Sequence, residues 1–199
     1  MFYFPVIISF FALGFAFYLI SWLRKIPEGP EEMQKIFRTI KEGANAFLKR
    51  QYRTIGIIAG ILTLLLFSVY GVSGNWLYGF QVASAFVFGA GCSLLSGFLG
   101  MWIAVRSNVR TANAAQTSFS RALTITLRGG AVSGISIVAM SLLGISLLFL
   151  VYNFFGYEAT GIPSSIVGFG FGASLVALFA QLGGGIYTKA ADVGADLVG

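Results

Sequence analysis

The stretch "FPVIISFFALGFAFYLISWL", from Phe4 to Leu23, contains no charged residue. A transmembrane helix needs about 20 mostly apolar residues, so this stretch is long enough to cross a bilayer. Four later stretches meet the same criterion, and the five expected spans are 4–23, 55–72, 80–105, 131–155 and 162–187. The sequence therefore predicts an all-α fold, a polytopic bundle of transmembrane helices.

The overall composition agrees with a membrane protein. Only 10% of the 199 residues are charged and 57% are hydrophobic, whereas soluble domains average about 25% charged residues. The chain has no histidine and a single cysteine, Cys92, which argues against zinc, haem and iron–sulfur sites. We expect Cys92, which lies among apolar residues, to be a small packing residue.

The basic residues indicate the orientation. All 13 Lys and Arg lie in the segments 24–54 and 106–130 or at Lys189, while the alternate connections carry only Glu158. By the positive-inside rule the basic side is cytosolic, which places the N-terminus outside and Lys189 in the cytosol. Topology thus accounts for the net charge of +6, and we expect no nucleic-acid partner.

The first basic segment carries a helical pattern, "GPEEMQKIFRTIKEGANAFLKRQYR" (Gly29–Arg53). Pro30 suits a first helical position, and Glu31 and Glu32 suit the first turn. Apolar residues follow at helical spacing: Met33, Ile36, Phe37, Ile40, Ala44, Phe47 and Leu48. We predict an interfacial helix leading into the second span; a solvated linker is the alternative.

Two stretches within the spans are rich in small residues, "GAGCSLLSGFLG" (Gly89–Gly100) and "GFGFGAS" (Gly168–Ser174). Small residues let the backbones of membrane helices approach closely. Both stretches are interpreted as packing surfaces in preference to ligand sites.

The chain closes on "GGGIYTKAADVGADLVG" (Gly183–Gly199), where charges follow a hydrophobic span. If the helix continues, Lys189, Asp192 and Asp196 share one face at i, i+3 and i+7. Carboxylates suit Mg²⁺ and a lysine can hold a phosphate oxygen, so the trio suits a magnesium–phosphate substrate. A weak, solvated ion pair at a helix end is the alternative.

This closing segment closely resembles the end of the fifth transmembrane helix of membrane-integral, ion-pumping inorganic pyrophosphatases. Three further stretches resemble the same family in the same order: "GANAFLKRQY" (Gly43–Tyr52), "GMWIAVRSNVRTANAAQ" (Gly100–Gln116) and "ALTITLRGGAVSG" (Ala122–Gly134). The resemblance implies hydrolysis of pyrophosphate at a cytosolic Mg²⁺ site, coupled to outward transport of protons, sodium ions or both. It also implies a homodimer with sixteen transmembrane helices per subunit, of which five are present here, and K⁺ as a further cofactor in one subclass.

The same resemblance implies roles for individual residues. Lys189 would bind substrate phosphate, and Asp192 and Asp196 would be catalytic and bind the metal, so that 189–199 begins the hydrolytic centre. Gln181 stands where family members commonly carry an arginine in the ion-gate and coupling region. An amide cannot form that arginine's ion pair, so Gln181 is interpreted either as a gate residue or as a packing and hydrogen-bonding residue.

The resemblance also implies that the chain is the N-terminal portion of a pump, in the plasma membrane or in that of an acidic compartment. Its partners would then be pyrophosphate, membrane lipid and the remaining helices. We expect the chain alone to be inactive, because two aspartates cannot complete a magnesium cage around pyrophosphate. One alternative is half of a secondary transporter without hydrolytic activity; another is a structural membrane subunit whose terminal charges are anchors.

Overall fold

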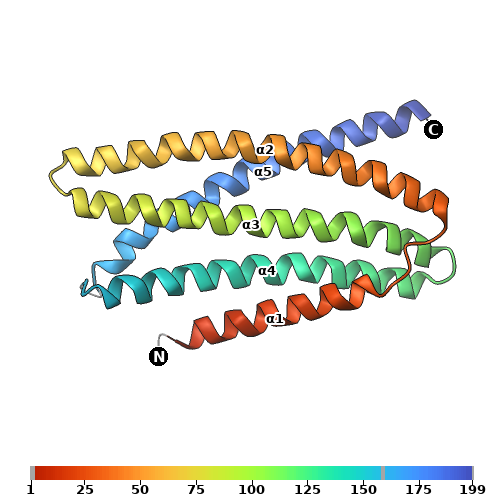
Figure 1. Cartoon of the computed structure of the whole chain (residues 1–199), viewed down its shortest axis with the longest axis horizontal. Coiled ribbons are helices and arrows are strands. Elements are labelled where there is room, and N and C mark those ends of the chain that lie inside the picture. Colours follow the sequence, from red (N-terminus) through yellow and green to blue (C-terminus); the bar gives the residue numbers. More distant parts are fainter. Residues whose placement is uncertain (1–2, 158–159, 199) are drawn as a thin grey trace. The chain divides into compact units, whose positions relative to one another are not determined.

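The computed structural model describes residues 3–157 and 160–198, so Glu158 lies outside the described residues. Within the described residues, five helices follow one another (Figure 1): α1 (Phe4–Arg24), α2 (Glu31–Val72), α3 (Trp76–Ala115), α4 (Phe119–Phe154) and α5 (Ile162–Val198). Each contains a window long and apolar enough to cross a membrane. The described ranges contain no strand, and the predicted all-α, polytopic fold is confirmed.

The helices extend well beyond the apolar spans. α2 has 42 residues and α3 has 40, about twice what a bilayer requires. The segments 24–54 and 106–130, expected as connections, are therefore mostly helical. The predicted interfacial helix and the second span form one continuous helix, which begins with Glu31 and Glu32 in its first turn.

Glycines and short polar side chains separate the helices. Gly29, Gly74 and Gly156 have φ angles of 93°, 88° and 81°, a left-handed conformation that side-chain-bearing residues rarely adopt. Asn75 Oδ1 accepts a hydrogen bond from the backbone N–H of Tyr78 at 3.0 Å at the start of α3. Ser118 caps α4 in the same way, by accepting from the N–H of Arg121 at 3.3 Å.

The chain divides into two compact units. The first comprises Met1–Ala46 and Leu95–Ile162, and the second comprises Phe47–Leu94 and Pro163–Gly199. The first unit thus contains α1, α4, the start of α2 and the end of α3. The second contains the rest of α2 and α3 together with nearly all of α5.

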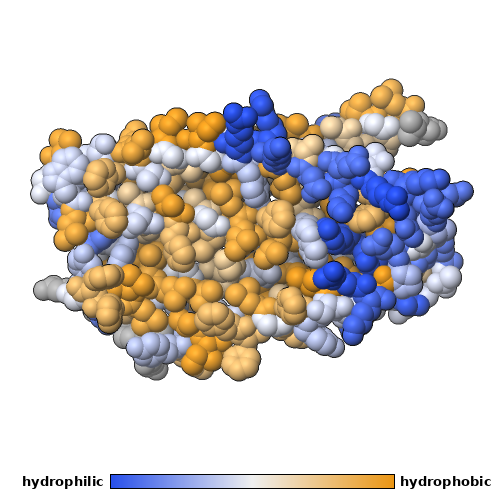
Figure 2. All heavy atoms as spheres, viewed as in Figure 1, coloured by the Kyte–Doolittle hydropathy of each residue, from blue (hydrophilic) through white to orange (hydrophobic). Residues whose placement is uncertain are grey.

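In the first unit, α1 packs along α4 (Figure 1). Its core includes Leu23, Ile103, Ile125 and Val132, which are all at most 2% exposed. Figure 2 shows hydrophobic residues over much of the visible surface and hydrophilic residues gathered where α1 ends and α2 begins. Such an apolar surface, which includes Phe11 at 74% exposed, suits contact with lipid or with further helices.

In the second unit, α3 and α5 approach backbone to backbone. A Cβ atom on Gly89 would collide with the carbonyl oxygen of Phe169, and one on Gly172 would collide with that of Phe86. The two glycine-rich stretches are therefore packing surfaces in this structure, as predicted. Cys92 is 8% exposed among these helices, which agrees with its predicted packing role.

Candidate active site

The charged end of α5 presents Lys189, Asp192 and Asp196 on one helical face. α5 is helical through Val198, so the three residues fall on the shared face that their spacing predicts. The Nζ atom of Lys189 lies 3.9 Å from Oδ2 of Asp192, and these side chains are 77% and 68% exposed. Asp196 follows Asp192 by one turn and is also exposed.

The exposure of this face decides what its charges can do. An ion pair at 3.9 Å between such exposed side chains is weak. Neither charged group is buried or tightly paired within the fold, and both remain accessible to a ligand. The same geometry also describes a solvated ion pair, so the distance by itself assigns no ligand.

The carboxylates of Asp192 and Asp196 suit a metal ion that binds together with a phosphate substrate. The described residues contain no group of three or more His, Cys, Asp or Glu able to hold a metal ion. Mg²⁺, however, usually keeps several waters and binds through one or two carboxylates plus substrate phosphates. Asp192 and Asp196, one turn apart on an open face, provide two such carboxylates.

Helix α2 contacts α5 just before the charged face. The Nε2 atom of Gln51 donates a hydrogen bond to the carbonyl oxygen of Phe179 at 2.5 Å. The rings of Phe47 and Tyr187 lie 5.1 Å apart between centroids. The sequence pattern predicts no role for Gln51 and places Phe47 only on an apolar helical face. Both residues lie in "GANAFLKRQY", with the glutamine one helical turn after the phenylalanine. This spacing is the one sequence feature that indicates a shared contact with another helix.

Helix α2 is also fixed to α3. The hydroxyl of Tyr52 donates to the carbonyl oxygen of Leu94 at 2.7 Å. One turn further on, Ile55 is fully buried in a cluster with Ala90 of α3 and Val176 of α5. Neighbouring residues of α2 therefore hold two different helices.

Gln181 lies on α5 with its side chain exposed. It precedes Lys189 by about 12 Å along the helix axis, at 1.5 Å per residue. The structure thus places it on the same helix as the charged face but at a different depth, and its gate role stays a prediction.

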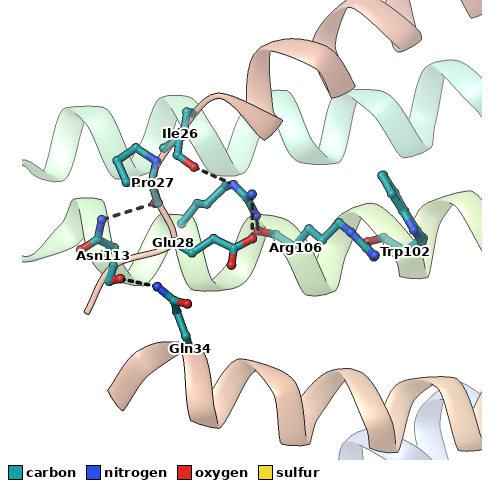
Figure 3. Close-up of polar contacts among 9 residues, drawn as sticks. Ile26, Pro27, Glu28, Gln34, Trp102, Arg106 and Asn113 are labelled. Atoms are coloured by element: carbon teal, nitrogen blue, oxygen red, sulfur yellow. Dashed lines mark hydrogen bonds and ion pairs between the residues drawn. The ribbon is translucent and has the colours of Figure 1, made fainter. Parts of the chain in front are cut away.

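A second set of polar side chains, in the first unit, fastens the connection before α2 onto α3 (Figure 3). Arg110 donates to Oε1 of Glu28 at 2.9 Å, to the carbonyl oxygen of Ile26 at 3.0 Å and to that of Arg106 at 2.8 Å. Asn113 donates to the carbonyl oxygen of Pro27 at 3.4 Å. Because the side chain of Arg110 is only 7% exposed, its charge is engaged by the fold.

Comparison with known families covers nearly the whole chain. Residues 10–199 match the family described as inorganic H+ pyrophosphatase. A K(+)-insensitive pyrophosphate-energized proton pump of Caldanaerobacter subterraneus is 51% identical over 91% of this chain. The K(+)-insensitive pyrophosphate-energized proton pump 2 of Moorella thermoacetica is 52% identical over 98% of the chain. A putative K(+)-stimulated pyrophosphate-energized sodium pump of Bacteroides thetaiotaomicron is 41% identical.

These relatives are much longer than the chain. The matched regions make up 27% of the Caldanaerobacter protein and 28% of the Moorella protein. The chain therefore spans little more than a quarter of the curated relatives that it matches.

Proposed function

Because the chain belongs to the inorganic H+ pyrophosphatase family, we propose that it forms the N-terminal part of a membrane pump driven by pyrophosphate hydrolysis. The pump moves protons or sodium ions outward and works as a homodimer. The basic segments 24–54 and 106–130 lie on its cytosolic side, as does Lys189. The observation that carries the proposal is the exposed Lys189–Asp196 face, in a chain that the family matches from residue 10 to residue 199.

Each residue of the face has a role in this proposal. The ammonium of Lys189 binds a phosphate oxygen and offsets its negative charge. Asp192 and Asp196 accept hydrogen bonds from the attacking water and provide carboxylate oxygens to the metal. Mg²⁺, when bound with the substrate, neutralises phosphate charge and polarises the phosphoryl oxygens.

The remaining carboxylates of the hydrolytic centre are proposed to come from helices beyond this chain. Two aspartates supply too few oxygens to hold several Mg²⁺ ions around pyrophosphate. Purified residues 1–199 should therefore show no magnesium-dependent release of phosphate. Robust hydrolysis by this chain alone would contradict the division of the site between segments.

The proposal is tested in the full-length pump that carries this chain. Asp192→Asn and Asp196→Asn keep the side-chain shape and remove the charge, and Lys189→Gln removes the ammonium. We expect each aspartate variant to lower kcat for phosphate release by about 100-fold, the size of effect seen when one group that stabilises a transition state is lost. Glu31→Gln is the matched control, because Glu31 is also an exposed helical carboxylate, at 81% against 68% for Asp192.

The outcome separates hydrolysis from the other functions considered. Loss of phosphate release with normal membrane insertion supports the catalytic role. Wild-type rates in both aspartate variants would contradict the catalytic role of these charges. No phosphate release from the parent pump itself would instead favour a transporter or a structural subunit.

A further inference from the structure

We propose that Gln51 and Phe47 of α2 are positioning residues that set the rotation and the axial register of the charged end of α5. The inference rests on the proposed function of Lys189, Asp192 and Asp196. It adds how contacts with α2 orient these three side chains. Neither residue is proposed to touch substrate or metal.

The contacts form a regular stripe along both helices. On α5 the contacted residues are Phe179, Gly183 and Tyr187, each one turn beyond the last, so they lie on one face. On α2 the two partners, Phe47 and Gln51, are also one turn apart. All five belong to the same compact unit.

These contacts lie on both sides of the segment of α5 that has the lowest helix propensity. Gly183, Gly184 and Gly185 are consecutive, and each glycine disfavours a helix relative to alanine. The Gln51 hydrogen bond holds the turn before this triplet, at Phe179, and the Phe47 ring holds the turn after it, at Tyr187. A bend or twist within the triplet is thereby opposed from both sides.

Register matters because the charged face begins immediately after the stripe. Tyr187 precedes Lys189 by two residues, and a helix turns about 100° per residue. A rotation of α5 equivalent to one residue would carry Lys189 and both aspartates a quarter of a turn or more around the helix axis. Phosphate and metal contacts require much finer alignment than that.

Gly183 provides an independent way to break the same contact. A Cβ atom there would come within 2.6 Å of Cδ of Gln51, so alanine at this position displaces the glutamine amide. A Cβ on Gly184 or Gly185 meets nothing within 4 Å. Gly183→Ala should therefore reproduce the loss of Gln51, and Gly184→Ala is its matched control.

The test measures geometry and activity in the full-length pump. Spin labels on Lys49 and Ala190, both exposed, report the distance between α2 and the end of α5 by pulsed EPR, in a background without other reactive cysteines. We expect one narrow distance distribution in the parent and in Gly184→Ala, and a broadened or shifted one in Gln51→Leu and Gly183→Ala. A distribution unchanged in both of the latter would overturn the inference.

Kinetics of the unlabelled pump sharpen the test. Gln51→Leu and Gly183→Ala should each lower kcat/KM for magnesium pyrophosphate by about 3- to 10-fold, as expected for losing one hydrogen bond, with a normal amount of folded pump in the membrane. The double variant Gln51→Leu/Gly183→Ala should lose no more than the worse single variant, because both changes remove one contact. Additive losses would contradict a shared contact.

The result distinguishes this inference from the function on which it rests. If Lys189→Gln impairs hydrolysis but the Gln51 variants leave both kcat/KM and the label distance unchanged, only the positioning role fails. If the label distance responds and the Lys189 and aspartate variants hydrolyse normally, α2 still aims α5, but the face is not the proposed active site.

Discussion

Arg110 in the first compact unit and Lys189 in the second have opposite environments for their charges. In the first, Arg110 is buried and paired with Glu28 at 2.9 Å, and it donates to two backbone carbonyls as well. In the second, Gln51 and Tyr52 make the contacts of α2 with α5 and α3 through neutral groups, while Lys189 and Asp192 stay exposed at the end of α5.

The difference separates structural charges from candidate functional ones. A buried charge must be fully paired, and removing its partner is costly, so Arg110 has the environment of a structural residue. An exposed pair contributes little to stability, so a stability argument does not explain why Lys189, Asp192 and Asp196 share one face. Under the proposed function, this shared face binds a charged ligand.

The largest expected effect on the free energy of unfolding comes from the close approach of α3 and α5 in the second unit. Gly172→Ala places a Cβ against the carbonyl oxygen of Phe86 and must push α3 and α5 apart, at a cost of about 3 kcal/mol for overpacking between backbones. Thermal unfolding in detergent should show a strongly lowered midpoint. Gly170→Ala, where a Cβ meets nothing within 4 Å, should behave like the parent, and equal midpoints for the two variants would contradict the close approach.

The next effect should come from the buried charge of the first unit. Arg110→Met removes the donor to Glu28, Ile26 and Arg106 and should destabilise the fold by about 2 kcal/mol. Arg121→Met is the control, because Arg121 is exposed on α4. If both variants melted alike, Arg110 would not be the structural charge described here.

A smaller loss is expected for the neutral contacts of the second unit. Tyr52→Phe removes only the hydroxyl that donates to Leu94 and should cost about 1 kcal/mol. Tyr18→Phe, at a tyrosine that is 59% exposed, should leave the unfolding midpoint unchanged. A loss as large as that of Arg110→Met would remove the contrast between the units.

The smallest effect on stability should come from the charged end of α5. Lys189→Gln breaks only a 3.9 Å exposed ion pair and should change the free energy of unfolding by less than about 0.5 kcal/mol. Marked destabilisation in the absence of substrate would indicate that Lys189 is a structural residue, as Arg110 is.

Hydropathy predicted the helices well but underestimated their lengths. Apolar runs such as 4–23 mark the part of a helix that lies within the membrane. They do not mark where a helix ends, because polar residues such as Lys35 and Arg38 can continue it in water. This is why α2 begins at Glu31, as the helical pattern of 29–53 predicts, and not near the predicted start of span 55–72.

The candidate site combines features set by local helical spacing with contacts between residues far apart in the sequence. The shared face of Lys189, Asp192 and Asp196 follows from helical spacing alone, which the sequence shows directly. The hydrogen bond from Gln51 to Phe179 joins residues 128 positions apart. It depends on how three helices pack, and one sequence carries no information about that pairing.

Binding of Mn²⁺, used in place of Mg²⁺, with pyrophosphate to the full-length pump tests the central claim most directly. EPR titration should find a tight, pyrophosphate-dependent Mn²⁺ site in the parent and in Glu31→Gln. The account predicts that Asp192→Asn and Asp196→Asn weaken that site by at least about tenfold while the unfolding midpoint stays unchanged. Parent-like Mn²⁺ affinity in both variants would contradict the account.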